Sequence, residues 1–279
     1  MIPIFSRSAR LALPGLVAVC GLAACQTAPR PDSGFLSDYG RLEVVEGTVR
    51  ASIRQHRDEA SAAQIERVWL EPSVLAGPAT TAALTAEERA LVLREVDRQV
   101  CYEISERFTL AASPEGAARV RTAVVRIGAT APAGSAVAAV ANAFIPGPGT
   151  VRVPGTTGGL AAEAELLDAR GGQAAALAWA RDANVLGTDS PSLSRVGDAL
   201  QMAEPFADTV ADAFAPADRA VRPIADPDPC ARFGPRFRPE GVAARFITGL
   251  YTPELSGAHA EESPNADPRS NSEAPSGDR

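Results

Sequence analysis

The sequence predicts a single layered α+β domain, in which an antiparallel or mixed sheet carries two packed helices. Two observations predict this class: two segments place apolar residues at helical spacing, and two strand-like segments flank a turn with two glycines. The expected order along the chain is strand, helix, strand, strand, strand, helix. Elements in this order bury their apolar faces most simply when the helices pack on the sheet.

The first strand and the first helix have clear boundaries. The strand is expected at residues 65–71, and Pro72 marks its end. The helix is expected at residues 86–108, where Thr85 and Glu88 have the spacing of a capping box. Apolar residues recur along it at helical spacing: Leu93, Val96, Val100, Ile104 and Phe108. One face of this helix is therefore expected to cover the sheet.

Three more strands are expected in the middle of the chain. Residues 118–128 have the pattern of a strand. Residues 160–168 and 173–182 have the same pattern, and a short turn with Gly171 and Gly172 joins them. These two segments are therefore expected to pair as a hairpin.

A second helix is expected after the hairpin. Its apolar stripe consists of Val196, Leu200, Ala203, Ala207, Val210 and Phe214. Ser190 or Ser192 is the expected N-cap, because a serine side chain accepts a bond from a free backbone N–H. Pro205 is expected to kink or restart the helix, because proline removes a backbone donor.

The N-terminal segment has the pattern of a lipoprotein signal peptide. Arg7 and Arg10 precede an apolar run at residues 11–22, and two alanines then lead to Cys25. Small residues directly before a cysteine are typical of the lipidated kind of secretory signal. Residues 1–24 are therefore expected to be removed, and Cys25 is expected to carry the acyl chains, palmitate among them.

A transmembrane anchor is the alternative interpretation of this segment. The run is shorter than the roughly 20 apolar residues that span a bilayer, and it contains Pro14 and Gly15. Cys20 is a second candidate for lipidation, but the bulky Val19 precedes it. Gln26, where aspartate would retain a lipoprotein at the inner membrane, resembles the outer-membrane sorting signal of enteric bacteria. We expect a lipid-anchored protein of the outer membrane, with its body in the periplasm.

The remaining chain divides by composition. Residues 25–33 have the composition of a lipidated tether, and residues 34–217 hold the expected α+β domain. Residues 218–255 are proline-rich and are expected to pack as an appendage, with a short helix at residues 239–250. Residues 256–279 are almost free of apolar side chains, which is typical of a disordered tail.

The charge and the histidines exclude several functions. The formal net charge is −7, the chain has no lysine, and the arginines are dispersed, which argues against a nucleic-acid partner. Beyond the signal, the two histidines are His56 and His259, and neither lies near the Gly-x-Ser-x-Gly turn of serine hydrolases. No cysteine–histidine pair has the spacing of zinc ligands. We therefore expect no enzymatic activity, no catalytic residue, no cofactor and no metal.

Two cysteines remain once Cys20 and Cys25 are assigned to the signal and the lipid. They are Cys101 and Cys230. An envelope compartment permits disulfides, so the two can form a bridge; two separate buried thiols are the alternative.

Two acidic residues, Glu163 and Glu165, share one face of an expected strand. Paired carboxylates can perform acid–base chemistry or hold a cation. Their apolar neighbours alternate as the core side, so we expect a solvated face. Asp168 is expected to begin the turn.

An uncharged run at residues 135–145 lies between two expected strands and is followed by Pro146. Such a run is either buried in the core or exposed as an interaction surface. The candidate surface residues are Val137, Val140, Phe144 and Ile145. They would contact a membrane or fill a groove of a partner protein.

A second apolar set follows the tether: Phe35, Leu36, Tyr39 and Leu42. It is expected to fold back over the sheet, where the Tyr39 hydroxyl needs one polar partner. A docking peptide is the alternative interpretation.

Four segments resemble a family of Gram-negative lipoproteins, the domain of unknown function 3313. They are Gly34–Leu42, Val68–Pro72, Arg119–Arg121 and Ala162–Asp168, the last followed by Gly171 or Gly172. The resemblance covers about residues 34–215. The family usually has aspartate where Glu71 stands, and it has no counterpart for residues 218–251. The resemblance implies an envelope lipoprotein and supplies no activity.

These observations together predict an outer-membrane lipoprotein that binds a protein partner in the cell envelope. One alternative is a carrier of a lipid or small ligand, in which the sheet and residues 135–145 enclose an apolar pocket. The other is a glycan hydrolase that depends on two carboxylates.

Overall fold

The computed structural model describes residues 27–48, 50–76, 84–142, 144 and 150–258. In these residues eight strands form one mixed sheet, in the order β1-β2-β9-β8-β6-β3-β5, with β4 also pairing with β6. The strands are β1 (Glu43–Val44), β2 (Ala51–Arg57), β3 (Arg67–Leu70), β4 (Val74–Leu75), β5 (Thr109–Leu110), β6 (Ala118–Gly128), β8 (Gly159–Leu167) and β9 (Gln173–Asp182). Neighbours pair antiparallel from β1 to β6, and β6 pairs parallel with β3 and β4.

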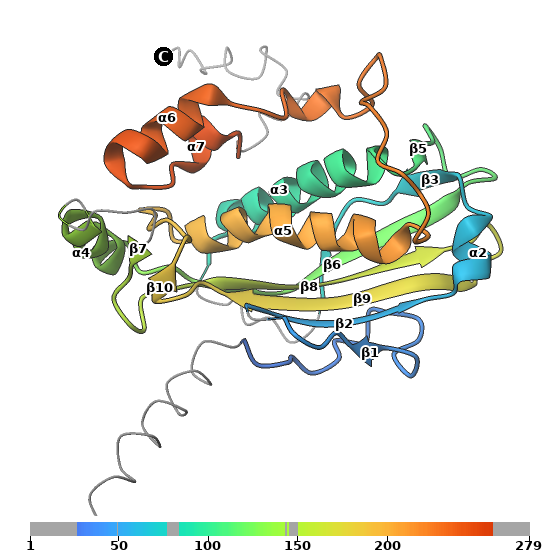
Figure 1. The fold of residues 1–279 in the computed structure, drawn as a ribbon, viewed down its shortest axis with the longest axis horizontal. Helices are drawn as coiled ribbons and strands as arrows, with labels where there is room; N and C mark the ends of the chain where they lie inside the picture. Colours follow the sequence, from blue (N-terminus) through green and yellow to red (C-terminus); the bar gives the residue numbers. More distant parts are fainter. Residues whose placement is uncertain (1–26, 49, 77–83, 143, 145–149, 259–279) are drawn as a thin grey trace, which may run out of the picture.

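Two long helices, α3 (Ala86–Ser105) and α5 (Gly197–Phe214), lie side by side on one face of the sheet (Figure 1). The shorter helices are α2 (Glu59–Ala63), α4 (Pro132–Asn142), the 3-10 turn η1 (Ala231–Phe233), α6 (Pro239–Thr248) and α7 (Pro253–Ser256). The strands β7 (Thr150–Val151) and β10 (Leu186–Gly187) form a separate pair beside α4. The predicted α+β class with a mixed sheet is therefore confirmed.

Helix α3 begins at its predicted capping box. Thr85 accepts a bond from the Glu88 backbone N–H, and the Glu88 carboxylate accepts one from the Thr85 N–H. The side chains of Val96, Val100 and Ile104 are buried against the sheet, as the apolar stripe predicts. For this helix, the predicted N-terminus and the predicted buried face are therefore both confirmed.

The predicted cap of α5 is wrong. The N-cap is Val196, which makes no side-chain cap bond. Ser192 instead donates to the carbonyl of Tyr251, and the Ser190 backbone N–H donates to the side chain of Gln201. The serines are used to hold the C-terminal segment and the loop before α5. Pro205 lies inside one uninterrupted helix.

Strand β2 was not expected from the sequence. Five of its seven side chains are polar and all seven residues are half-buried, so the segment has a weak apolar signal. It pairs with β9 along its whole length, from Ala51 to Arg57. His56, expected on a polar surface, lies in this strand and is half-buried.

The second face of the sheet is covered by the N-terminal segment at residues 33–41. The Tyr39 hydroxyl donates to Glu163 at 2.6 Å, and the Ser37 backbone N–H and hydroxyl donate to Glu165 at 2.9 and 2.7 Å. Burial, together with the bond to Glu163, raises the pKa of the Tyr39 phenol. The expected return of this segment over the sheet is confirmed.

The solvated face predicted for Glu163 and Glu165 is wrong. Their exposed fractions are 3% and 0%. Glu165 also accepts bonds from Arg121 and Gln173. Carboxylates are tolerated at such a depth because every oxygen finds a donor. The donors to Glu163 come from residues 33–41, and those to Glu165 come from this segment and from the neighbouring strands.

The described part of the expected tether, residues 27–33, also lies along the sheet. The Thr27 hydroxyl donates to the Arg50 carbonyl and accepts from the Asp182 backbone N–H, both at 2.9 Å. Arg30 forms an ion pair with Asp182. This segment is therefore bonded to the body, which differs from the free tether expected. Cys25 lies outside the described residues.

The C-terminal appendage packs over the helices, and the expected helix is present as α6. Of the two states that the sequence leaves open, Cys101 and Cys230 form the disulfide, with their Cα atoms 5.9 Å apart. Ala258 is buried in the main core, so the chain is still packed two residues into the segment that the sequence predicts as a tail. His259 and the residues after it lie outside the described residues. Within the described chain, no helix has both the length and the apolar character needed to cross a membrane.

We predict that the double variant Cys101→Ser, Cys230→Ser loses about 5 kcal/mol in its free energy of unfolding, because the bridge closes a very long loop. Urea denaturation of the mature protein measures this loss. A reductant should destabilise the natural chain and leave the double variant unchanged. Equal stability of the two chains would contradict the prediction.

Candidate functional site

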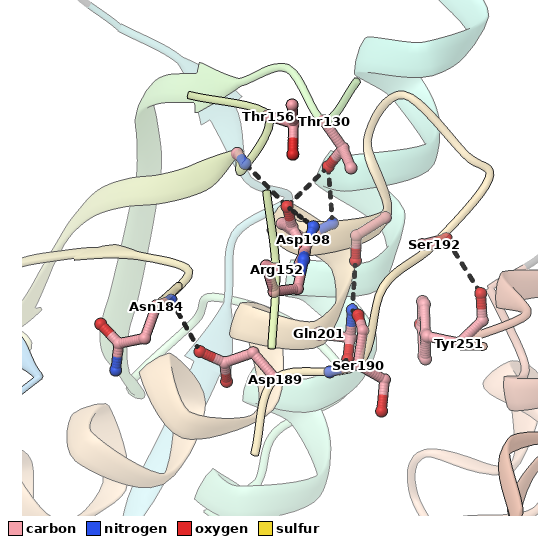
Figure 2. Close-up of polar contacts among 12 residues, drawn as sticks. Thr130, Arg152, Thr156, Asn184, Asp189, Ser190, Ser192, Asp198, Gln201 and Tyr251 are labelled. Atoms are coloured by element: carbon pink, nitrogen blue, oxygen red, sulfur yellow. Dashed lines mark hydrogen bonds and ion pairs between the residues drawn. The ribbon is translucent and has the colours of Figure 1, made fainter. Parts of the chain in front are cut away.

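One end of the sheet is organised around a buried carboxylate, Asp198, in the first turn of α5 (Figure 2). Arg152 donates to its two oxygens at 2.6 and 2.9 Å, and both side chains are fully buried. The Thr130 hydroxyl donates to it at 2.9 Å and the Gly158 backbone N–H at 2.7 Å. The partial positive charge of the helix N-terminus also favours a carboxylate at this position. Both carboxylate oxygens therefore have donors, whereas the buried Nε of Arg152 has no hydrogen-bond partner among the described residues.

Asp198 joins segments that are otherwise connected by loops. Thr130 precedes α4, Arg152 follows β7, and Gly158 precedes β8. Figure 2 shows that the loop before α5 lies beside this cluster. There the Asn184 backbone N–H donates to Asp189. Since its oxygens are all occupied by the protein, Asp198 has a structural role.

The candidate surface residues predicted in the run at 135–145 lie on and directly after α4. Val137, Val140 and Phe144 are 61%, 65% and 82% exposed. The core interpretation is therefore wrong for these three side chains, while Ser135 and Ala138 on the opposite face are buried. Ile145 lies outside the described residues.

A second exposed apolar surface lies on α6. Val242, Phe246 and Ile247 are 57%, 91% and 80% exposed. The sequence predicts a short helix here and an appendage that packs on the body, but these apolar side chains do not make that contact. The helix packs by Gly241 instead, where an added Cβ would lie 2.8 Å from the Leu255 carbonyl oxygen. Glycine has no side chain, so a helix face that packs through glycine gives no signal in the pattern of apolar residues.

The two acidic residues considered for acid–base chemistry do not form an open site. Glu163 and Glu165 are buried under residues 33–41, and each carboxylate is bonded to side chains of the protein. A glycan could not reach them without displacing that segment. Asp168 accepts bonds from the backbone of Arg170 and Gly172, as expected for a turn residue.

A cleft of about 610 Å³ lies between α3, α5 and the C-terminal appendage. Its lining carries both charges and includes Glu95, Arg98, Glu103, Glu204 and Arg238. This location differs from the pocket expected between the sheet and residues 135–145, and the lining is charged where that pocket was expected to be apolar. Among the residues that the structure describes, no group of three or more acidic, histidine or cysteine side chains could hold a metal ion.

Glu103 is the carboxyl group in the lining of this cleft whose pKa is raised into the neutral range. Burial, and then the neighbouring carboxylates of Glu106, Asp208 and Glu204, raise its pKa to about 7. Such a carboxyl exchanges its proton near neutral pH.

The comparisons with known proteins give one family and a weak structural likeness. The model of the family described as "Protein of unknown function (DUF3313)" matches residues 31–210. No curated protein matches the chain. Two solved structures of the PelC dodecamer from Paraburkholderia phytofirmans, one of them of a variant in which methionine replaces a leucine, are each 11% identical to this chain. They cover 59% and 60% of it and 96% and 99% of their own chains, with TM-scores of 0.35 and 0.34.

We predict that Asp198→Asn lowers the free energy of unfolding by about 3–5 kcal/mol, because it leaves the Arg152 guanidinium buried without a counter-charge. Asp212→Asn is the matched control, since Asp212 forms an exposed ion pair with Arg107. The control should change stability by less than about 1 kcal/mol. Chemical denaturation of both variants measures the difference, and equal losses would contradict the assignment.

We predict that Glu103→Gln changes the pH dependence of stability. With its pKa raised to about 7 in the folded state, Glu103 keeps a proton that the unfolded chain has released. The contribution of Glu103 to the free energy of unfolding is therefore full at pH 4, where the carboxyl is protonated in both states. It is lost as the pH rises to about 7. Glu103→Gln should gain on the order of 1 kcal/mol relative to the natural chain over that interval, since solvent screens a half-buried group.

The measurement is urea denaturation at several pH values between 4 and 8. Glu240→Gln is the control, because Glu240 is an exposed residue of α6. Its pH profile should run parallel to that of the natural chain. A parallel profile for Glu103→Gln as well would contradict the prediction.

Proposed function

The chain belongs to the DUF3313 family of proteins of unknown function, and we propose that it is an outer-membrane lipoprotein that binds a protein partner in the cell envelope. In this proposal Cys25 carries the lipid and the body lies in the periplasm. The support for the anchor is the sequence pattern at residues 7–25: a basic start, a short apolar run and small residues before a cysteine. Several acyl chains on one cysteine give a stable attachment.

The fixed position of Thr27 bears on how the body would sit. Only Gln26 lies between Cys25 and Thr27, so the cysteine reaches at most about 7 Å from the point where Thr27 is bonded to the end of the sheet. A lipid at Cys25 would hold this edge of the body against the membrane surface. The surfaces available to a partner are then those that point away from the anchor.

The observation that carries the partner proposal is the exposed apolar face of α6. Three large apolar side chains, Val242, Phe246 and Ile247, stand in solvent on a helix that is attached to a stable platform. The disulfide fixes the appendage to α3, and Arg236 bonds the Tyr102 carbonyl and the Ser105 hydroxyl of the same helix.

The energetics favour a protein as the occupant of this face. Transfer of a Val, Ile or Phe side chain from water to an apolar contact contributes about 1.5–3 kcal/mol when burial is complete. Three neighbouring side chains of this kind form the apolar centre of a protein interface. Figure 1 shows α6 above the helix layer, while the N-terminal segment lies below the sheet. A partner on α6 would not compete with the anchor for space.

Glu163 and Glu165, the pair considered for acid–base chemistry, are covered by residues 33–41. Glu163 and Glu165 hold the N-terminal segment to the sheet, and this role uses their oxygens. The proposal therefore assigns no catalytic step and no cofactor.

A second candidate function, carriage of a small ligand, has one observation in its favour. The cleft of about 610 Å³ has a volume that is ordinary for ligand pockets. Its charged lining favours a polar ligand over a lipid. Native mass spectrometry of protein purified from its own cells would show the added mass of such a ligand.

We predict that Phe246→Asp reduces capture of the partner at least tenfold, because a carboxylate cannot be desolvated against an apolar surface. The lipidated protein is crosslinked in its own cells and its partners are identified by mass spectrometry. Val221→Asp is the matched control, since Val221 is also an exposed apolar residue, at 55%. The control should retain capture.

The same purified protein gives an independent test of the anchor. Mass spectrometry of the N-terminal peptide should show acyl chains on Cys25. Equal capture by Phe246→Asp and Val221→Asp would overturn the role of α6, and an unmodified N-terminal segment would overturn the anchor.

A further inference from the structure

The outward face of α4 has an unusual composition for a helix in water. Its exposed residues are Ala133, Ala136, Val137, Val140 and Ala141, and Phe144 follows the helix. None of the eleven residues from Pro132 to Asn142 is charged. A solvated helix face normally carries charged or strongly polar side chains. This face therefore has the composition of a buried surface although nothing in the described chain covers it.

The described chain begins at the same end of the sheet as α4. Strand β6 ends at Gly128, and α4 begins four residues later. Gly128 pairs with Gly159, and Gly159 pairs with Asp182. The backbone N–H of Asp182 donates to the Thr27 hydroxyl. With about 5 Å between paired strands, Gly128 lies about 10 Å from Asp182, the residue to which Thr27 is bonded.

Helix α4 is held firmly in this place. The Asn142 side chain bonds the backbone N–H and carbonyl of Val151 at 2.8 and 3.2 Å. Gly134 lies against the Thr156 side chain, where an added Cβ would be 2.4 Å away. Thr130, just before the helix, bonds the buried Asp198. The apolar face is therefore presented in a fixed orientation.

A bilayer matches this face better than a second protein does. Eleven helical residues extend about 16 Å, which is too short to cross a membrane and suits a helix lying at its surface. Lipid is the apolar phase that the anchor of Cys25 would bring to this end of the body. Only Val137, Val140 and Phe144 would enter the boundary between headgroups and acyl chains.

We infer that the outward face of α4 docks on the lipid bilayer that holds Cys25, with Val137, Val140 and Phe144 at the level of the upper acyl chains. This inference rests on the proposed anchor and adds a second contact that sets the orientation of the body. Orientation then follows from two points, the lipidated cysteine and α4. Helix α6 lies above the helix layer, on the side of the molecule opposite the N-terminal segment (Figure 1).

Depth-dependent quenching of tryptophan fluorescence tests the inference. Phe144→Trp is introduced into the mature full chain, which is reconstituted into vesicles of phosphatidylethanolamine and phosphatidylglycerol with brominated acyl chains. Phe246→Trp on α6 is the matched control, since Phe246 is exposed to a similar extent. The native Trp69 and Trp179 give a background that is subtracted with the unsubstituted chain.

The expected result is quenching of Phe144→Trp to below half of its intensity in unbrominated vesicles, with no quenching of Phe246→Trp. A further change, Val140→Asp, should reduce the quenching at least threefold while the protein remains attached to the vesicles. Because apolar contact provides the docking, the quenching should persist when salt is raised from about 0.1 M to about 0.5 M, which screens exposed charges more strongly.

The outcomes separate the inference from the anchor. Attached protein with no quenching of Phe144→Trp overturns the docking of α4 and leaves the anchor standing. If mass spectrometry shows that Cys25 is not acylated, the anchor is overturned. In that case the Cys25 thiol is coupled to a maleimide lipid to attach the protein to the vesicles. The quenching of Phe144→Trp then still decides whether α4 enters the bilayer.

Discussion

The ion pair between Arg152 and Asp198 holds together the end of the sheet beside α4, and the arrangement of that end depends on it. Both charges are fully buried, and the carboxylate is further bonded by Thr130 and Gly158. A buried carboxylate is tolerated only when its oxygens are bonded, and the donors to Asp198 come from three other segments, so the four segments that meet there must keep their positions. This requirement fixes α4 relative to the sheet. The exposed apolar side chains of α4 consequently have a defined direction, which a helix on free loops would not have.

The two apolar faces belong to different parts of the protein. Helix α4 lies inside the segment that matches the family, residues 31–210, and near the beginning of the described chain. Helix α6 lies outside that segment and is attached by the Cys101–Cys230 disulfide. In our interpretation the family region supplies the contact with the membrane, and the appendage adds a contact with a protein. The face of the sheet opposite α3 and α5 is closed by Tyr39 and the residues around it.

Particular residues show why some local elements were predicted and some contacts were not. The box at Thr85 and the hairpin at residues 168–172 depend on neighbours within five positions, so local pattern is sufficient. The sequence predicts an exposed Glu163 because apolar residues alternate with it along the strand and were expected to form the buried side. Its burial depends on Ser33 and Tyr39, 130 and 124 positions away. A repeat pattern in the sequence gives no information about contacts between residues so far apart along the chain.

The sequence by itself determined the fold class, the family, the two long helices and the expectation of a lipid anchor, because short-range spacing and signal motifs encode these. It also placed the candidate surface at Val137, Val140 and Phe144 but left open whether it is core or exposed. Only the tertiary structure decided that these residues are exposed, that the apolar side chains of α6 are exposed as well, and that the two glutamates are covered. Burial is a property of what packs from elsewhere in the chain, and for α6 that packing runs through a glycine that has no side chain to reveal it.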